Sequence, residues 1–137
     1  MLKKTITYTD YDGTTRKEDF YFNLNKSELM RLDLTTEGGV EKLIKKMISE
    51  RDNKKIFEMF EKIILMSYGE KSLDGRRFIK SEELSREFTQ TEAYNVLLLE
   101  LTENEKTMAD FINGVLPSDL MAKAEDVEKI KEEVGLN

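Results

Sequence analysis

The feature that most restricts the fold of this chain is an Asp12-Gly13 turn between two runs of alternating polar and apolar residues. Asp-Gly between such runs is a strong signal for a β-hairpin. A three-residue loop over residues 11–13 places five apolar side chains on one face: Leu2, Ile6, Tyr8, Phe20 and Phe22. A two-residue loop would place Ile6 opposite Asp19. We therefore predict a hairpin over residues 2–22 with the longer loop.

From Asn25 onward, apolar residues recur every three or four positions, which is the spacing of amphipathic helices. Thr36–Gly39 and Pro117 interrupt this pattern and are expected to end helices. Residues suited to helix N-termini precede the apolar runs, and three of them form capping boxes with a later glutamate. The predicted starts are Asn25 with Glu28, Asp52 or Asn53, Ser81, Thr89 with Glu92, and Thr102 with Glu105.

One helix is expected to be the most buried, because its apolar residues cover a wide face. Its predicted core residues are Phe57, Phe60, Ile63 and Ile64. An earlier stripe predicts another amphipathic helix and consists of Val40, Leu43, Ile44, Met47 and Ile48. The fold class that follows is α+β and mostly α, with the hairpin packed on a bundle of about five to six short helices.

The helices and the hairpin are expected to form one domain over residues 1–117, with helices between residues 26 and 117. Residues 118–137 carry a thinner apolar stripe at helical spacing: Leu120, Ala124, Val127, Ile130 and Val134. This stripe predicts a C-terminal amphipathic helical segment that packs loosely or binds a partner.

The composition argues against an enzyme. The 137 residues include no Cys and no His, so the chain lacks a thiol nucleophile, the usual general base and the commonest metal ligand. We predict no catalytic residues, no cofactor and no metal site. The calcium-like stretch Asp10–Gly13 is better explained as the hairpin turn, because Tyr21 stands where a calcium loop needs Glu.

Net charge and short apolar runs also exclude two classes of partner. The chain has 22 Lys and Arg residues and 28 Asp and Glu residues. The resulting net charge of −6 argues against sequence-independent nucleic-acid binding. Apolar runs such as Ile63–Met66 are far shorter than the roughly 20 residues of a membrane span. We expect a cytoplasmic protein that binds neither nucleic acid nor membrane.

The charges are unevenly distributed along the chain. Residues 39–80 carry 11 basic and 7 acidic groups, whereas residues 81–137 carry 5 basic and 14 acidic groups. Two interpretations remain open: two solvated faces of one monomer, or a head-to-tail attraction between copies of the chain.

Apolar residues are in excess near the end of the predicted domain. A single helix face cannot bury all of the apolar residues between positions 94 and 101, so a second contact surface is expected there. The candidate partner-binding residues are Tyr94, Leu97, Leu98, Leu99, Leu101, Phe111, Ile112, Val115 and Leu116. The alternative is that the core of the monomer uses both helices completely.

Several short segments, in this order and at this spacing, resemble the tail assembly chaperones of long-tailed phages and prophages of Gram-positive bacteria. The resemblance extends to about Pro117. Its segments are Met1–Ile6, Glu18–Leu24, Thr36–Gly39, Tyr68–Ser72, Asp74-Gly75, Arg77–Ser81, Gln90–Tyr94 and Phe111–Pro117.

The resemblance implies a non-enzymatic chaperone that self-associates and binds the tape measure protein, keeping it soluble and guiding assembly of the tail tube. It implies the tape measure protein as partner, the tail tube protein as a possible second partner, and action in the host cell cytoplasm. It also implies absence from the mature virion. The competing hypothesis is a small prophage-encoded adaptor or inhibitor that binds a folded host protein.

Overall fold

The N-terminal hairpin has the predicted three-residue loop. In the computed structural model, which describes residues 1–39, 42, 45–46 and 49–117, strand β1 (Leu2–Thr9) pairs antiparallel with β2 (Thr15–Phe22). Leu2 lies opposite Phe22, and Gly13 adopts a φ of 83°, which a glycine allows in this loop position. The five predicted apolar residues share the face that packs on the core, so the register prediction is confirmed.

The hairpin is part of a larger sheet than the sequence indicated. Strands β3 (Tyr68–Lys71) and β4 (Phe78–Ile79) extend it to four antiparallel strands in the order β1-β2-β3-β4. From sequence alone, Gly69 and Gly75 in this stretch predict a loop with at most a short extended piece. Gly69 allows this pairing, because a Cβ at residue 69 would lie 2.7 Å from the backbone oxygen of Ile79.

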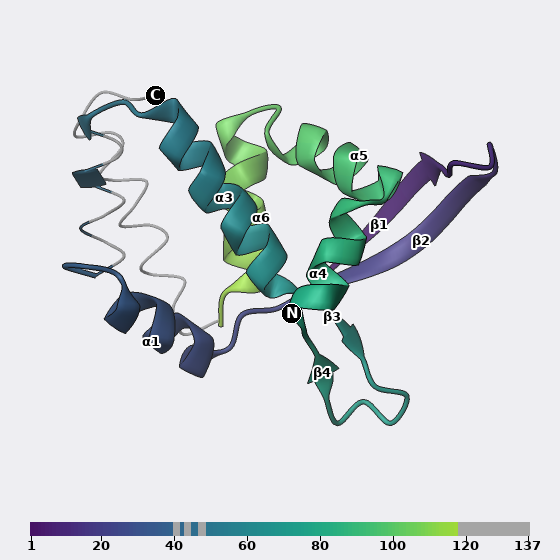
Figure 1. Ribbon diagram of the computed structural model, residues 1–137, viewed down its shortest axis with the longest axis horizontal. Helices are drawn as coiled ribbons and strands as arrows, with labels where there is room; N and C mark the ends of the chain where they lie inside the picture. The colour runs from purple at the N-terminus through teal and green to yellow at the C-terminus, as the bar shows by residue number, and fades with distance from the viewer. Residues whose placement is uncertain (40–41, 43–44, 47–48, 118–137) are drawn as a thin grey trace.

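Within the described residues there are five helices (Figure 1). Their bounds are α1 (Lys26–Thr35), α3 (Asn53–Ser67), α4 (Glu82–Thr89), α5 (Glu92–Leu101) and α6 (Glu105–Val115). Of these, α5 and α6 pack against β1, and α4 packs against β3. Figure 1 shows α5 beside β1, and the hairpin of β3 and β4 projecting away from the helices. The predicted α+β class is therefore confirmed.

Three of the predicted helix starts are confirmed, and two are wrong by two residues. The side chains of Asn25, Asp52 and Ser81 cap their helices as expected, and Asn25 forms the full capping box with Glu28. Helices α5 and α6 are capped instead by Thr91 and Asn104, whose side-chain oxygens accept from the backbone N–H of Tyr94 and Thr107.

The predicted caps Thr89 and Thr102 lie at helix ends instead. Thr89 is the last residue of α4, and its hydroxyl donates to the carbonyl oxygen of Arg86. Thr102 follows α5, and its hydroxyl donates to the carbonyl oxygen of Leu98. Neither residue has the extended backbone of an N-cap, since Thr89 is part of α4 and Thr102 has a ψ of 3°, whereas Thr91 and Asn104 are extended with ψ of 151° and 166°.

The core prediction for α3 is partly confirmed. Phe60 and Ile64 are buried at 3% and 0% exposure, and Ile63 packs against the core from its edge. Phe57 is 39% exposed, so its assignment to the core is wrong. The reason is its position near the start of α3, because Figure 1 shows this end of the helix extending away from the sheet.

Two predicted segments lie outside the described residues. They are the helix built on Val40, Leu43, Ile44, Met47 and Ile48, and the C-terminal segment 118–137. No helix in the described part of the chain is long and apolar enough to cross a membrane.

The burial of α3 predicts unequal costs for two similar substitutions. Phe60→Ala should lower the free energy of unfolding by about 3–5 kcal/mol, because it leaves a cavity beside the ring of Phe111. Phe57→Ala is the matched control and should cost less than about 1 kcal/mol. Urea denaturation monitored by circular dichroism measures the free energy of unfolding of both variants. Equal losses of stability would show that the assigned core face of α3 is wrong.

Candidate functional site

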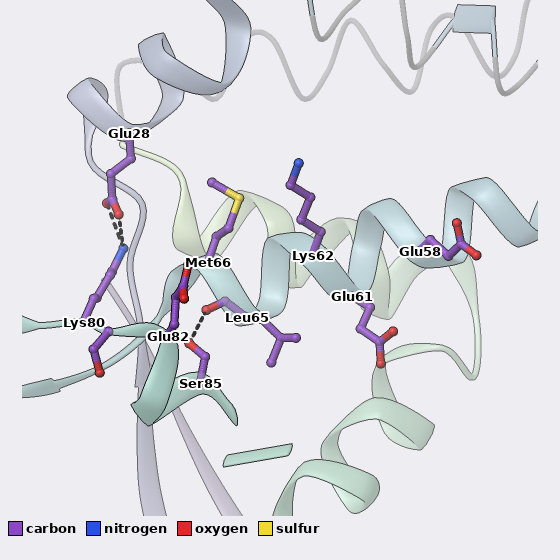
Figure 2. Close-up of a pocket in the computed structure, with 10 residues that line it drawn as sticks. Glu28, Glu58, Glu61, Lys62, Leu65, Met66, Lys80, Glu82 and Ser85 are labelled. Carbon is purple, nitrogen blue, oxygen red and sulfur yellow. Dashed lines mark hydrogen bonds and ion pairs between the residues drawn. The ribbon is translucent and has the colours of Figure 1, made fainter. Parts of the chain in front are cut away.

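A groove of about 550 Å³ lies along α3, and we name it the α3–α4 groove (Figure 2). Helix α3 supplies one wall, the start of α4 supplies the other, and Glu28 of α1 closes one end. Its lining residues are Glu28, Glu58, Glu61, Lys62, Leu65, Met66, Lys80, Ser81, Glu82 and Ser85. This volume suits a few side chains of a bound segment rather than a whole helix.

The apolar part of the groove comes from Leu65 and Met66, which are both half-buried near the end of α3. The hydroxyl of Ser85 donates to the carbonyl oxygen of Leu65 at 2.9 Å and so ties α4 to α3. Methionine is flexible and polarisable, and it adapts well to varied apolar partners. The wall near α4 can therefore accept apolar side chains of different shapes.

One end of the groove is closed by an ion pair between segments far apart in the sequence. The ammonium group of Lys80 lies 2.7 Å from both carboxylate oxygens of Glu28 and also donates to the carbonyl oxygen of Asn23. Glu28 at the same time accepts from the backbone N–H of Asn25 in the capping box. Because both side chains are largely withdrawn from solvent, this pair fixes the start of α1 against the strand that leads into α4.

Another hydrogen bond joins the groove to α5. The hydroxyl of Tyr94 donates to the carboxylate of Glu61. Burial of the phenol raises the pKa of Tyr94 well above its usual value, and the hydrogen bond to Glu61 raises it further. The Glu61 carboxylate is therefore held toward α5 by a phenol that stays neutral across the physiological range.

The remaining groove charges are available to a partner. Among the described residues, the carboxylates of Glu58 and Glu82 form no ion pair. Counting all the lining residues, four glutamates stand against two lysines, so the groove has a net negative charge. An acidic rim beside an apolar wall favours a segment that carries both apolar and basic side chains.

Catalysis has no support in this arrangement. The chain has no His and no Cys, and the described residues contain no group of carboxylates that could hold a metal ion. The groove carboxylates are spread along the rim.

The structure places most of the candidate partner-binding residues of α5 and α6 in the core. Tyr94, Leu97, Leu101, Phe111 and Val115 are buried, and Leu98, Ile112 and Leu116 are half-buried. Only Leu99, at 73% exposure, lies fully on the surface among these nine residues. Helices α5 and α6 bring the buried members together against β1, and the binding role of the accessible ones stays a prediction.

Sequence reasoning missed the α3–α4 groove. A signal was present, because Glu58, Glu61, Lys62, Leu65 and Met66 recur at helical spacing and mark a second, mixed face of α3. In the sequence, that face has the pattern of ordinary solvent-exposed helix surface. It becomes the wall of a groove because α4 lies beside it, and the linear sequence does not reveal this contact.

The two buried phenols predict a loss of stability at alkaline pH. Burial, followed by the nearby charge of Glu70, raises the pKa of Tyr68 from 10.0 to about 12, and the pKa of Tyr94 is also raised. The unfolded chain releases these protons first, so the stabilisation is complete below pH 10 and is lost as the pH rises toward about 12.

Urea unfolding between about pH 9 and pH 11 measures this slope, with ionised tyrosine followed by its absorbance. Tyr94→Phe is the control and should flatten the slope, because it removes one of the two raised groups. A wild-type free energy of unfolding that is constant over this interval would contradict the assignment.

A family model described as "Phage tail assembly chaperone" matches residues 1–135 of the chain. No curated protein and no solved structure matches it.

Proposed function

The chain belongs to the phage tail assembly chaperone family, which is non-enzymatic, and we propose that it binds the tape measure protein before the tail tube forms around it. The observation that carries this proposal is the α3–α4 groove, with its apolar wall and its excess of carboxylates. Tape measure proteins are long and helical, so they offer repeated amphipathic segments to such a groove.

The binding geometry follows from the side chains that line the groove. One or two apolar residues of a client helix pack on Leu65 and Met66, and basic residues on either side of them approach Glu58 and Glu82. The buried apolar area supplies affinity, at roughly 25 cal/mol per Å². The exposed carboxylates add orientation and a faster encounter rather than much affinity.

A weak site of this kind works by repetition along a long client. Many copies of the chaperone cover the apolar stripe of the tape measure protein and keep it soluble, and they self-associate as neighbours. They leave when the tail tube protein, a second possible partner, polymerises around the tape measure protein. On this proposal the chaperone acts in the cytoplasm of a Gram-positive host and is absent from the mature virion.

Charge reversal at the groove tests the proposal. The double variant Glu58→Lys, Glu82→Lys should retain at least tenfold less tape measure protein in co-expression and pull-down, because basic client residues would meet like charges. Both residues are exposed, so the variant should fold normally, and circular dichroism verifies this. The matched control is Glu103→Lys, at an exposed site after α5, which should retain the client as the wild type does.

The α5 surface has its own test within the same assay. Leu99→Asp should remain folded because its side chain is exposed, whereas Leu98→Asp should destabilise the chain because Leu98 packs against the core. If the groove holds the client, Leu99→Asp keeps it. Loss of the client with Leu99→Asp, together with retention by the groove variant, would place binding on α5 and contradict the proposed site.

A further inference from the structure

The hairpin of β3 and β4, which we name the arm (residues 68–79), projects away from the rest of the molecule (Figure 1). Leu73 at its tip is the most exposed large apolar side chain in the described part of the chain. Leucine is unusual in such a turn, where polar residues and glycine are common. An apolar side chain held outward on a projecting turn is available to enter a concave surface.

Hydrogen bonds hold the tip of the arm in one conformation. The Ser72 hydroxyl donates to the Asp74 carboxylate at 2.7 Å, and the same carboxylate accepts from the backbone N–H of Arg76 at 3.0 Å. The backbone N–H of Arg77 donates to the Ser72 hydroxyl, and the carbonyl oxygen of Arg77 accepts from the Ser72 N–H. Because the tip is already ordered, little conformational entropy is lost when it docks.

The tip is also basic. Arg76 and Arg77 are exposed, and among the described residues neither guanidinium forms an ion pair. Lys71 lies at the base of the arm, with its ammonium group 4.3 Å from the centre of the Tyr21 ring. One leucine beside two arginines is the combination of apolar and basic groups that the α3–α4 groove suits.

We propose that the arm of a second copy of this chain docks its tip in the α3–α4 groove, so that self-association and tape measure binding compete for one site. In this contact Leu73 packs on Leu65 and Met66, and the arginines of the tip approach Glu58 and Glu82. The proposal rests on the proposed function, because it assigns the same groove a second occupant.

The position of the arm determines the geometry of this contact. The arm begins and ends beside the groove, since Lys80 follows β4 directly, and its tip points away from α3 (Figure 1). A tip directed outward reaches the groove of another copy rather than its own. The contact is therefore heterologous, with a different surface on each partner, and it adds copies head to tail.

The contact is also small. A turn of six residues buries much less surface than the roughly 1,200 Å² of a stable interface, so the self-association is weak and is displaced by a longer client. The ion pairs are exposed and screened beyond about 8 Å at physiological ionic strength, so the association weakens as salt is added.

Complementation between two broken copies tests the proposal. An arm variant, Leu73→Ser with Arg77→Glu, keeps its groove, and a groove variant, Glu58→Lys with Glu82→Lys, keeps its arm. In sedimentation velocity over a concentration series, each variant alone should be monomeric, and an equimolar mixture should form a 1:1 dimer that grows no further. The matched control, Leu34→Ser with Arg31→Glu on α1, changes another exposed leucine and arginine and should associate as the wild type does.

Three results would overturn the inference: a wild type that is monomeric throughout the series, an arm variant that associates as the wild type does, or a mixture that contains no dimer. The tape measure pull-down separates this failure from failure of the proposed function. The arm variant should retain the client at least as well as the wild type, because its groove is free of competing tips. If the arm variant retains the client but self-associates as the wild type does, the further inference is wrong and the proposed function stands.

Discussion

The packing of Phe22 at the end of β2 positions most of the other elements. Its ring is fully buried and lies between 5.3 and 6.0 Å, centre to centre, from the rings of Tyr68, Phe88 and Phe111. These residues belong to β3, α4 and α6, so one side chain holds the hairpin against three other elements. Helix α3 ends at Ser67, directly before Tyr68, and both walls of the α3–α4 groove are therefore placed by the same aromatic cluster.

Local chemistry explains which parts of the fold could be predicted from sequence. The hairpin register followed from side-chain parity, since a three-residue loop puts Ile6 and Phe22 on the same face and a two-residue loop does not. The predicted caps of α5 and α6 were wrong because two polar residues near each helix start are suited to the N-cap position. The hydrogen bonds in the structure identify Thr91 and Asn104 as the caps. Strand β3 was missed because its first two residues pair with the end of β2, far away in the sequence.

The charge pattern also shows that the order of residues along the chain does not tell which charges lie together in the fold. Along the sequence, residues 39–80 are basic and residues 81–137 are acidic. In the fold, Glu58 and Glu61 of the basic segment line the same groove as Glu82 of the acidic one, and together they make it negative. The basic character of the middle segment is instead presented partly on the arm, by Arg76 and Arg77. The apolar residues of α5 show the same limit of the linear sequence, because most of them are buried in the fold and only Leu99 among the candidate binding residues is fully exposed.

Site-specific cross-linking tests the central claim that the α3–α4 groove holds the client. Because the chain contains no cysteine, Glu58→Cys and Leu99→Cys each introduce a single thiol that can carry a short photoreactive group. Each labelled protein is irradiated in its complex with the tape measure protein, and cross-linked product is measured on a gel. The account predicts a strong cross-link from residue 58 and little from residue 99. A strong cross-link from residue 99 with none from residue 58 would contradict it.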